Sequence, residues 1–163
     1  MPSKLSEELS PFYVMEVLER AREIEAGGGD VIHFEVGEPD FRTPGSVAAE
    51  AARAIEEGDT KYVHSMGIPE LRSAVASHYE KTYGVTVSPS RVAITMGSSP
   101  ALFLAMISHI EPGDEVLITD PHYACYPQII KIAGGVPVTV RVYEDEGYQI
   151  DASRLEKSIG DRT

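Results

Sequence analysis

The sequence has 163 residues, of which 42% are hydrophobic and 25% are charged, values typical of a single globular domain. Its 14 Lys and Arg residues against 26 Asp and Glu residues give a formal net charge of −12, which argues against a nucleic-acid partner because phosphate backbones are bound by basic surfaces. Cys125 is the single cysteine, so neither a disulfide framework nor a thiolate metal cluster is expected.

The amino-terminal residues do not have the pattern of a targeting segment. Charges are scattered through them, and they contain no continuous apolar core. No apolar run in the chain approaches the roughly 20 residues that cross a bilayer. We therefore expect a soluble, cytoplasmic protein with no membrane partner.

The first half of the chain predicts helices separated by turn-rich segments. Helical periodicity covers residues 11–26 and ends at three glycines, and residues 31–36 are predicted to form a short strand that leads into the turn formers GEPDFRTP. Pro44 is typical of a first helical turn, and the helix that follows it ends at Gly58. After a loop, an amphipathic helix is predicted over residues 68–84.

The second half alternates regularly between strands and helices. Strands are predicted at 91–96, 116–119 and 136–142, and helices at 99–110, at 123–133 and from 152 onward. Strands that alternate with helices of about ten residues are typical of βαβ crossovers, which place neighbouring strands parallel in one sheet. An α/β fold is therefore expected.

The turn Gly97-Ser98-Ser99-Pro100 between a predicted strand and helix has three possible explanations. It could be an ordinary cap, with Ser99 at the N-cap and Pro100 at the first helical position. It also resembles the hydrolase nucleophile elbow, but Pro100 lacks the backbone N–H that such an elbow needs. The third explanation is a phosphate site, because the N–H groups of Ser98, Ser99 and Ala101 would point out of a helix start. No dinucleotide or P-loop motif accompanies it, so the phosphate would not belong to a nucleotide.

Four stretches in one order carry a resemblance to a known family. They are FEVGEPDFRTP, TKYVHSMGIPELRSAVASHY, VAITMGSSPALFLAM and EPGDEVLITDPHYACYPQIIKIAGGVPV. Together they resemble the amino-terminal half of the pyridoxal-phosphate (PLP) aminotransferases of fold type I, the aspartate aminotransferase-like class I/II group. The resemblance implies a three-layer α/β/α large domain, here incomplete, whose first part is residues 44–163. Residues 1–43 would form a helical arm with a short strand that contacts the small domain or the partner subunit.

The resemblance also implies site residues. The glycine and two serines of the GSSP turn match the family's phosphate cup, and Tyr123 matches the aromatic residue that stacks on the cofactor ring. Tyr62 matches a tyrosine that reaches the cofactor phosphate of the other subunit of a homodimer, and Gly37 matches a backbone position beside the substrate carboxylate. The last three also have simpler explanations: Tyr123 could be a core tyrosine, Tyr62 a loop tyrosine and Gly37 a turn glycine.

No catalytic residue is predicted within the chain. The family's chemistry needs a Schiff-base lysine, and none of the lysines matches its motif: Lys4, Lys61, Lys81, Lys131 and Lys157. The histidines show no metal-ligand spacing, so no metal is assigned. We expect a PLP-dependent aminotransferase that moves an amino group between an amino acid and a 2-oxo acid, present as an amino-terminal portion that is inactive alone. The alternatives are a non-catalytic module that binds PLP or a phosphate anion, and a PLP lyase of the same fold.

Overall fold

The computed structural model describes residues 1–163, which fall into two compact units. One unit consists of Met1–Gly37 together with Ser99–Thr163, and the other of Glu38–Ser98. None of the helices combines the length and apolar character needed to cross a bilayer.

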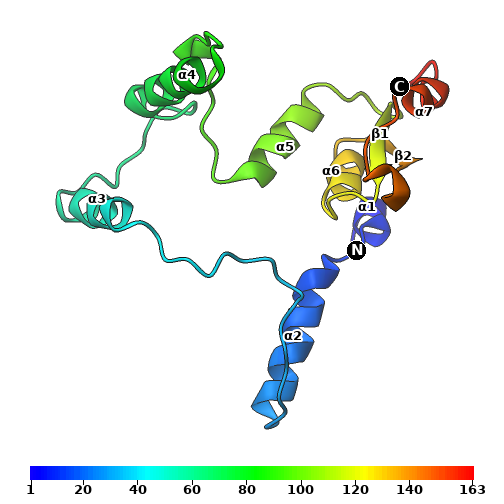
Figure 1. The fold of residues 1–163 in the computed structure, drawn as a ribbon, viewed down its shortest axis with the longest axis horizontal. Coiled ribbons are helices and arrows are strands. Elements are labelled where there is room, and N and C mark those ends of the chain that lie inside the picture. The colour runs from blue at the N-terminus through cyan, green and yellow to red at the C-terminus, as the bar shows by residue number, and fades with distance from the viewer. The chain divides into compact units, whose positions relative to one another are not determined.

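The first unit contains a βαβ crossover (Figure 1). Strand β1 (Glu115–Asp120) pairs in parallel with β2 (Val136–Arg141), in a register that sets Glu115 opposite Val136 and Asp120 opposite Arg141. Helix α6 (Tyr126–Ile132) connects the strands and packs on β2. A parallel pair requires such a crossover connection, so the predicted α/β character is confirmed for this part of the chain.

Apart from Ala21 on α2 (Tyr13–Ala26), the buried hydrophobic side chains of this unit gather around that crossover. Ile130 of α6 is 0% exposed, and Val140 and Val142 are also buried. Gly135 allows the close packing of helix and strand, because a Cβ there would lie 2.9 Å from Ile110 and 3.1 Å from Ile130. The core of the unit therefore lies between α6 and the two strands.

Helix α7 (Ala152–Ser158) follows β2 after a 3₁₀ turn, η2 (Glu144–Glu146), which confirms the helix predicted from residue 152. The Asp151 side chain caps α7 by accepting a hydrogen bond from the Ser153 N–H at 2.8 Å. Arg154 donates two hydrogen bonds to Glu146 and lies 4.9 Å from the centre of the Tyr143 ring. These contacts attach α7 to the turn that precedes it.

The amino-terminal part of the first unit contains α1 (Lys4–Glu8), which was not predicted, and α2 (Tyr13–Ala26). Helix α2 confirms the periodicity, although it begins two residues later than predicted. The Ser3 side chain accepts a hydrogen bond from the Ser6 N–H and so caps α1. The Ser10 N–H donates to the Gln128 side chain at 3.3 Å, which holds the segment between the two helices against α6.

The second unit consists of α3 (Gly45–Glu56), α4 (Pro69–Tyr83) and the 3₁₀ turn η1 (Pro89–Arg91). Both predicted helices are confirmed. Helix α4 ends at Gly84, whose φ of 66° is a left-handed conformation that favours glycine. The Arg72 guanidinium donates to the Pro89 carbonyl at 2.7 and 2.9 Å and so ties η1 to α4.

Two predicted strands are wrong. Residues 31–36 and 91–96 form no strand, although their composition is typical of one, and Arg91 belongs to η1 instead. A strand needs a partner for its backbone groups, and here β1 and β2 pair only with each other. In the second segment the Ile94 N–H donates to the Met66 carbonyl at 3.1 Å, which is a single contact rather than a ladder. Large apolar side chains in these segments, such as Ile32, Phe34 and Met96, are exposed.

Candidate functional site

The GSSP turn leads directly into helix α5 (Ser98–Ile107). The helix begins at Ser98, one residue before the predicted start, so Ser99 lies inside its first turn and the ordinary-cap explanation, with Ser99 at the N-cap, does not hold. Gly97, which precedes the helix, has a φ of 85°, and a Cβ at this position would meet no atom within 4 Å. The residue before the helix therefore has no side chain that could cap it, and its backbone is open to the surroundings.

The N-terminus of α5 retains free hydrogen-bond donors. The N–H groups of Ser98 and Ser99 donate to no acceptor within the chain, whereas the Thr95 hydroxyl donates to the Gly97 carbonyl at 2.7 Å and holds the turn. The first N–H groups of a helix carry a partial positive charge. Chemically, this turn can therefore bind an anion.

Tyr123 follows β1 and has a half-exposed ring, with 48% of the residue accessible to solvent. Tyr126 supports it edge-on, with the ring centres 5.4 Å apart and the planes at 73°. The neighbouring Cys125 thiol raises the pKa of the Tyr123 phenol above its ordinary value. A tyrosine hydroxyl is neutral at physiological pH even at that ordinary value. An exposed, uncharged aromatic face of this kind can stack on a flat ring.

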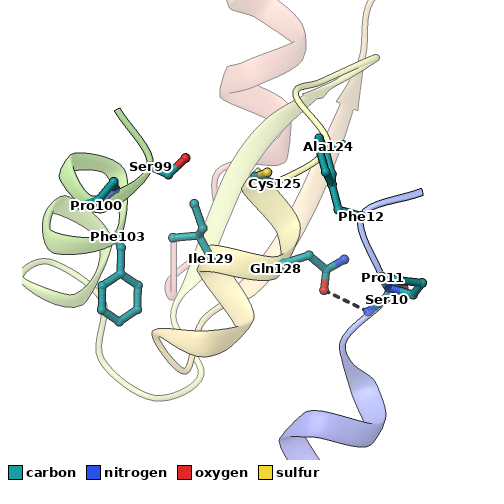
Figure 2. A pocket seen from close by; sticks show the side chains of 10 residues that line it. All are labelled: Ser10, Pro11, Phe12, Ser99, Pro100, Phe103, Ala124, Cys125, Gln128 and Ile129. Atoms are coloured by element: carbon teal, nitrogen blue, oxygen red, sulfur yellow. Dashed lines mark hydrogen bonds between the residues drawn. The ribbon is translucent and has the colours of Figure 1, made fainter. Parts of the chain in front are cut away.

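A pocket of about 520 Å³ lies beside these residues (Figure 2). Helix α5 contributes one side, α6 and the segment that leads into it contribute the second, and the residues before α2 contribute the third. No charged side chain lines it, and the lining residues are Ser10, Pro11, Phe12, Ser99, Pro100, Phe103, Ala124, Cys125, Gln128 and Ile129. The structure thus brings Ser99 to the same pocket as the two residues that follow Tyr123.

The other two predicted site residues lie in irregular segments. Gly37 is exposed, and a Cβ on it would meet no atom within 4 Å. Tyr62 belongs to the second unit and is fully exposed in the loop between α3 and α4. Their roles, and those of the cup residues and Tyr123, stay predictions.

Sequence reasoning missed the contribution of Ser10, Pro11 and Phe12 to the pocket. The periodicity placed Pro11 within a helix, but α2 begins at Tyr13 and leaves these residues outside it. Proline has no N–H and favours positions outside or at the very start of helices. Pro11 directly before an aromatic residue was therefore the available signal for a non-helical segment here.

Comparisons with known proteins identify the family of the chain. Residues 29–163 match the family described as Aminotransferase class I and II. The chain is 39% identical over 155 residues to an aspartate/prephenate aminotransferase of Cereibacter sphaeroides, which covers 95% of this chain and 39% of that protein. It is also 39% identical over 163 residues to a (5-formylfuran-3-yl)methyl phosphate transaminase of Methanocaldococcus jannaschii, covering 100% of this chain and 42% of that protein.

Among solved structures, the aspartate aminotransferase of Thermus thermophilus with maleate matches with a TM-score of 0.96 and 36% identity. That match covers 100% of this chain and 43% of the other. The chain thus spans about 40% of the length of the curated relatives that it matches. Given a family match over residues 29–163, the chain belongs to the class I and II aminotransferases, in the aspartate aminotransferase-like group.

Proposed function

We propose that the chain provides the phosphate- and ring-binding part of a PLP-dependent aminotransferase, which moves an amino group between an amino acid and a 2-oxo acid. The start of α5 is the observation that carries this proposal. The N–H groups of Ser98 and Ser99 are free there, and Gly97 leaves room for an anion to approach the backbone. These features fit a phosphate group.

The predicted site residues also fit the cofactor by their chemistry. PLP, when bound, supplies the electron sink for bond changes at the amino acid's α carbon. Gly97, Ser98 and Ser99 would hold its phosphate, and the Tyr123 face would stack on its ring. Tyr62 would reach the phosphate of the other subunit of a homodimer, and the Gly37 backbone would lie beside the substrate carboxylate.

The βαβ crossover is proposed to be one part of the family's three-layer α/β/α large domain. On this account residues 44–163 belong to that domain and residues 1–43 form the arm. The two unpaired edges of the two-stranded sheet and the exposed apolar side chains are consistent with a larger domain.

The chain is proposed to bind PLP without catalysing transamination. Transamination needs a base that moves the α proton and a lysine that bonds the cofactor, and no lysine here matches that role. When the chain is incubated with PLP, reduced with borohydride and digested, we expect no single lysine to carry the label stoichiometrically. Stoichiometric labelling of one lysine, or turnover by the chain, would contradict this proposal, because it would show that a lysine of the chain bonds the cofactor or that the chain catalyses transamination.

The overall activity is tested on the protein expressed at the full length of its gene. We expect it to convert an amino acid and a 2-oxo acid to the 2-oxo acid of the donor and the amino acid of the acceptor. The substrates in the assay should include aspartate, prephenate and (5-formylfuran-3-yl)methyl phosphate, because two relatives of equal identity have these different substrates in their names. Elimination products would instead support a lyase, and PLP retention without turnover of any donor would support a binding module.

A further inference from the structure

His33 lies between two carboxylates in the segment that follows α2. Its Nε2 atom is 2.9 Å from Oε1 of Glu25, near the end of α2, and its Nδ1 atom is 2.5 Å from Oε1 of Glu35. The Glu35 side chain is only 8% exposed, whereas that of His33 is 38% exposed. The imidazole therefore bridges the helix and the irregular segment.

The chemistry of the ring fixes its protonation state in this arrangement. A neutral imidazole has one N–H and one lone pair, and an ionised carboxylate can only accept. Two hydrogen bonds to two ionised carboxylates therefore require the imidazolium, which donates from both nitrogens. If His33 loses its proton, one of the two contacts becomes a repulsion between lone pairs and must open. The Glu35 contact is the shorter one, at 2.5 Å against 2.9 Å, so the Glu25 contact, which joins the segment to α2, is the one that opens.

We propose that His33 is a positioning residue: its imidazolium clips residues 31–37 to the carboxyl end of α2, and the clip opens when His33 is deprotonated. The clip fixes the backbone that leads to Gly37. That Gly37 then contacts a substrate carboxylate rests on the proposed function, whereas the clip itself does not.

The backbone around the clip brings its members together. After α2 the chain reverses at the glycines and runs back along the helix (Figure 1). The Gly29 N–H donates to the Ile24 carbonyl at 2.9 Å, and a Cβ at Gly29 would lie 2.5 Å from the Ile24 side chain. Val31 joins Ile24 and Ala21 around a shallow hollow on α2. The reversal thus places His33 beside Glu25, eight residues earlier.

The charges around His33 decide the direction of its pH dependence. Hydrogen bonds to Glu35 and then to Glu25 raise the His33 pKa above its ordinary 6.5, and the His33 contact lowers the Glu35 pKa below its ordinary 4.5. Neither carboxylate pairs with a lysine or arginine, and Arg20 on α2 pairs with Glu23 instead. The stabilisation from His33 is complete below pH 6.5 and is lost as the pH rises through its raised pKa. The stabilisation of the folded state from Glu35 is complete above pH 4.5 and is lost as the pH falls through the lowered pKa of Glu35.

Proton NMR titration of the His33 ring in the chain, without PLP or substrate, tests the clip. We expect a midpoint above 6.5 that falls toward 6.5 in Glu35→Gln and, by less, in Glu25→Gln. Glu23→Gln, the same change on α2 but at a carboxylate that does not contact His33, should leave the midpoint unchanged. The ¹⁵N heteronuclear NOE of residues 34–37 provides a second readout, because it reports fast backbone motion. It should fall as the pH passes the His33 midpoint, and His33→Gln should abolish that step.

The outcomes separate this inference from the proposed function. A His33 midpoint at or below 6.5, a midpoint that is the same in all three glutamine variants, or an NOE that is independent of the His33 midpoint would overturn the clip. None of these results depends on PLP. Failure of PLP to bind at Ser98 and Ser99 would overturn the proposed function and would leave the clip standing.

Discussion

Ile130→Ala is expected to lower the free energy of unfolding of the first unit by about 2–5 kcal/mol. Ile130 is 0% exposed, lies on α6, and its side chain packs beside Gly135, the residue before β2. Removing its methyl and methylene groups loses their burial and leaves a cavity that a helix tied to two strands can close only in part. The measurement is amide exchange of the β1–β2 ladder at increasing urea concentration.

Ile132→Ala is the matched control for this prediction. Ile132 is the same residue type on the same helix, but it is 41% exposed. Its replacement should therefore change the free energy of unfolding by much less. Equal losses for the two variants would show that α6 does not hold the core through Ile130.

Tyr123→Ala is expected to weaken PLP binding by about 1–3 kcal/mol, the scale of lost aromatic stacking and burial. Each 1.4 kcal/mol corresponds to a tenfold rise in the dissociation constant for PLP. Tyr123→Phe keeps the ring and should bind PLP nearly as well as the unchanged protein. The measurement is a PLP titration followed by absorbance, on the full-length gene product. An alanine variant with unchanged affinity would assign Tyr123 a purely structural role.

The sequence predicts the helices and the crossover well because their signals are local. The glycines after α2, Gly84 after α4 and the apolar runs of β1 and β2 each act within a few residues. Residues 31–36 and 91–96 have the composition of strands but do not form them, because pairing depends on partners elsewhere. Local patterns cannot show whether such a partner is present.

In the candidate site, too, local features were predicted and contacts between distant segments were not. The GSSP turn correctly indicated that a helix begins here. Its first residue was misplaced by one position, because Gly97 rather than a serine precedes α5. The side of the pocket formed by Ser10, Pro11 and Phe12 arises from packing of a distant segment on α6, which no local pattern records. The His33 clip likewise depends on a chain reversal that brings Glu25 close to His33.

The most direct test of the account is a ¹⁵N NMR titration of the chain with PLP and, separately, with inorganic phosphate. The account predicts that both ligands shift the amide signals of Ser98 and Ser99, because their free N–H groups would donate to the phosphate. It also predicts that PLP alone shifts the Tyr123 signals, and that Gly97→Val reduces all of these shifts, since a φ of 85° is strained for valine. PLP that binds while the Ser98 and Ser99 signals stay in place would contradict it.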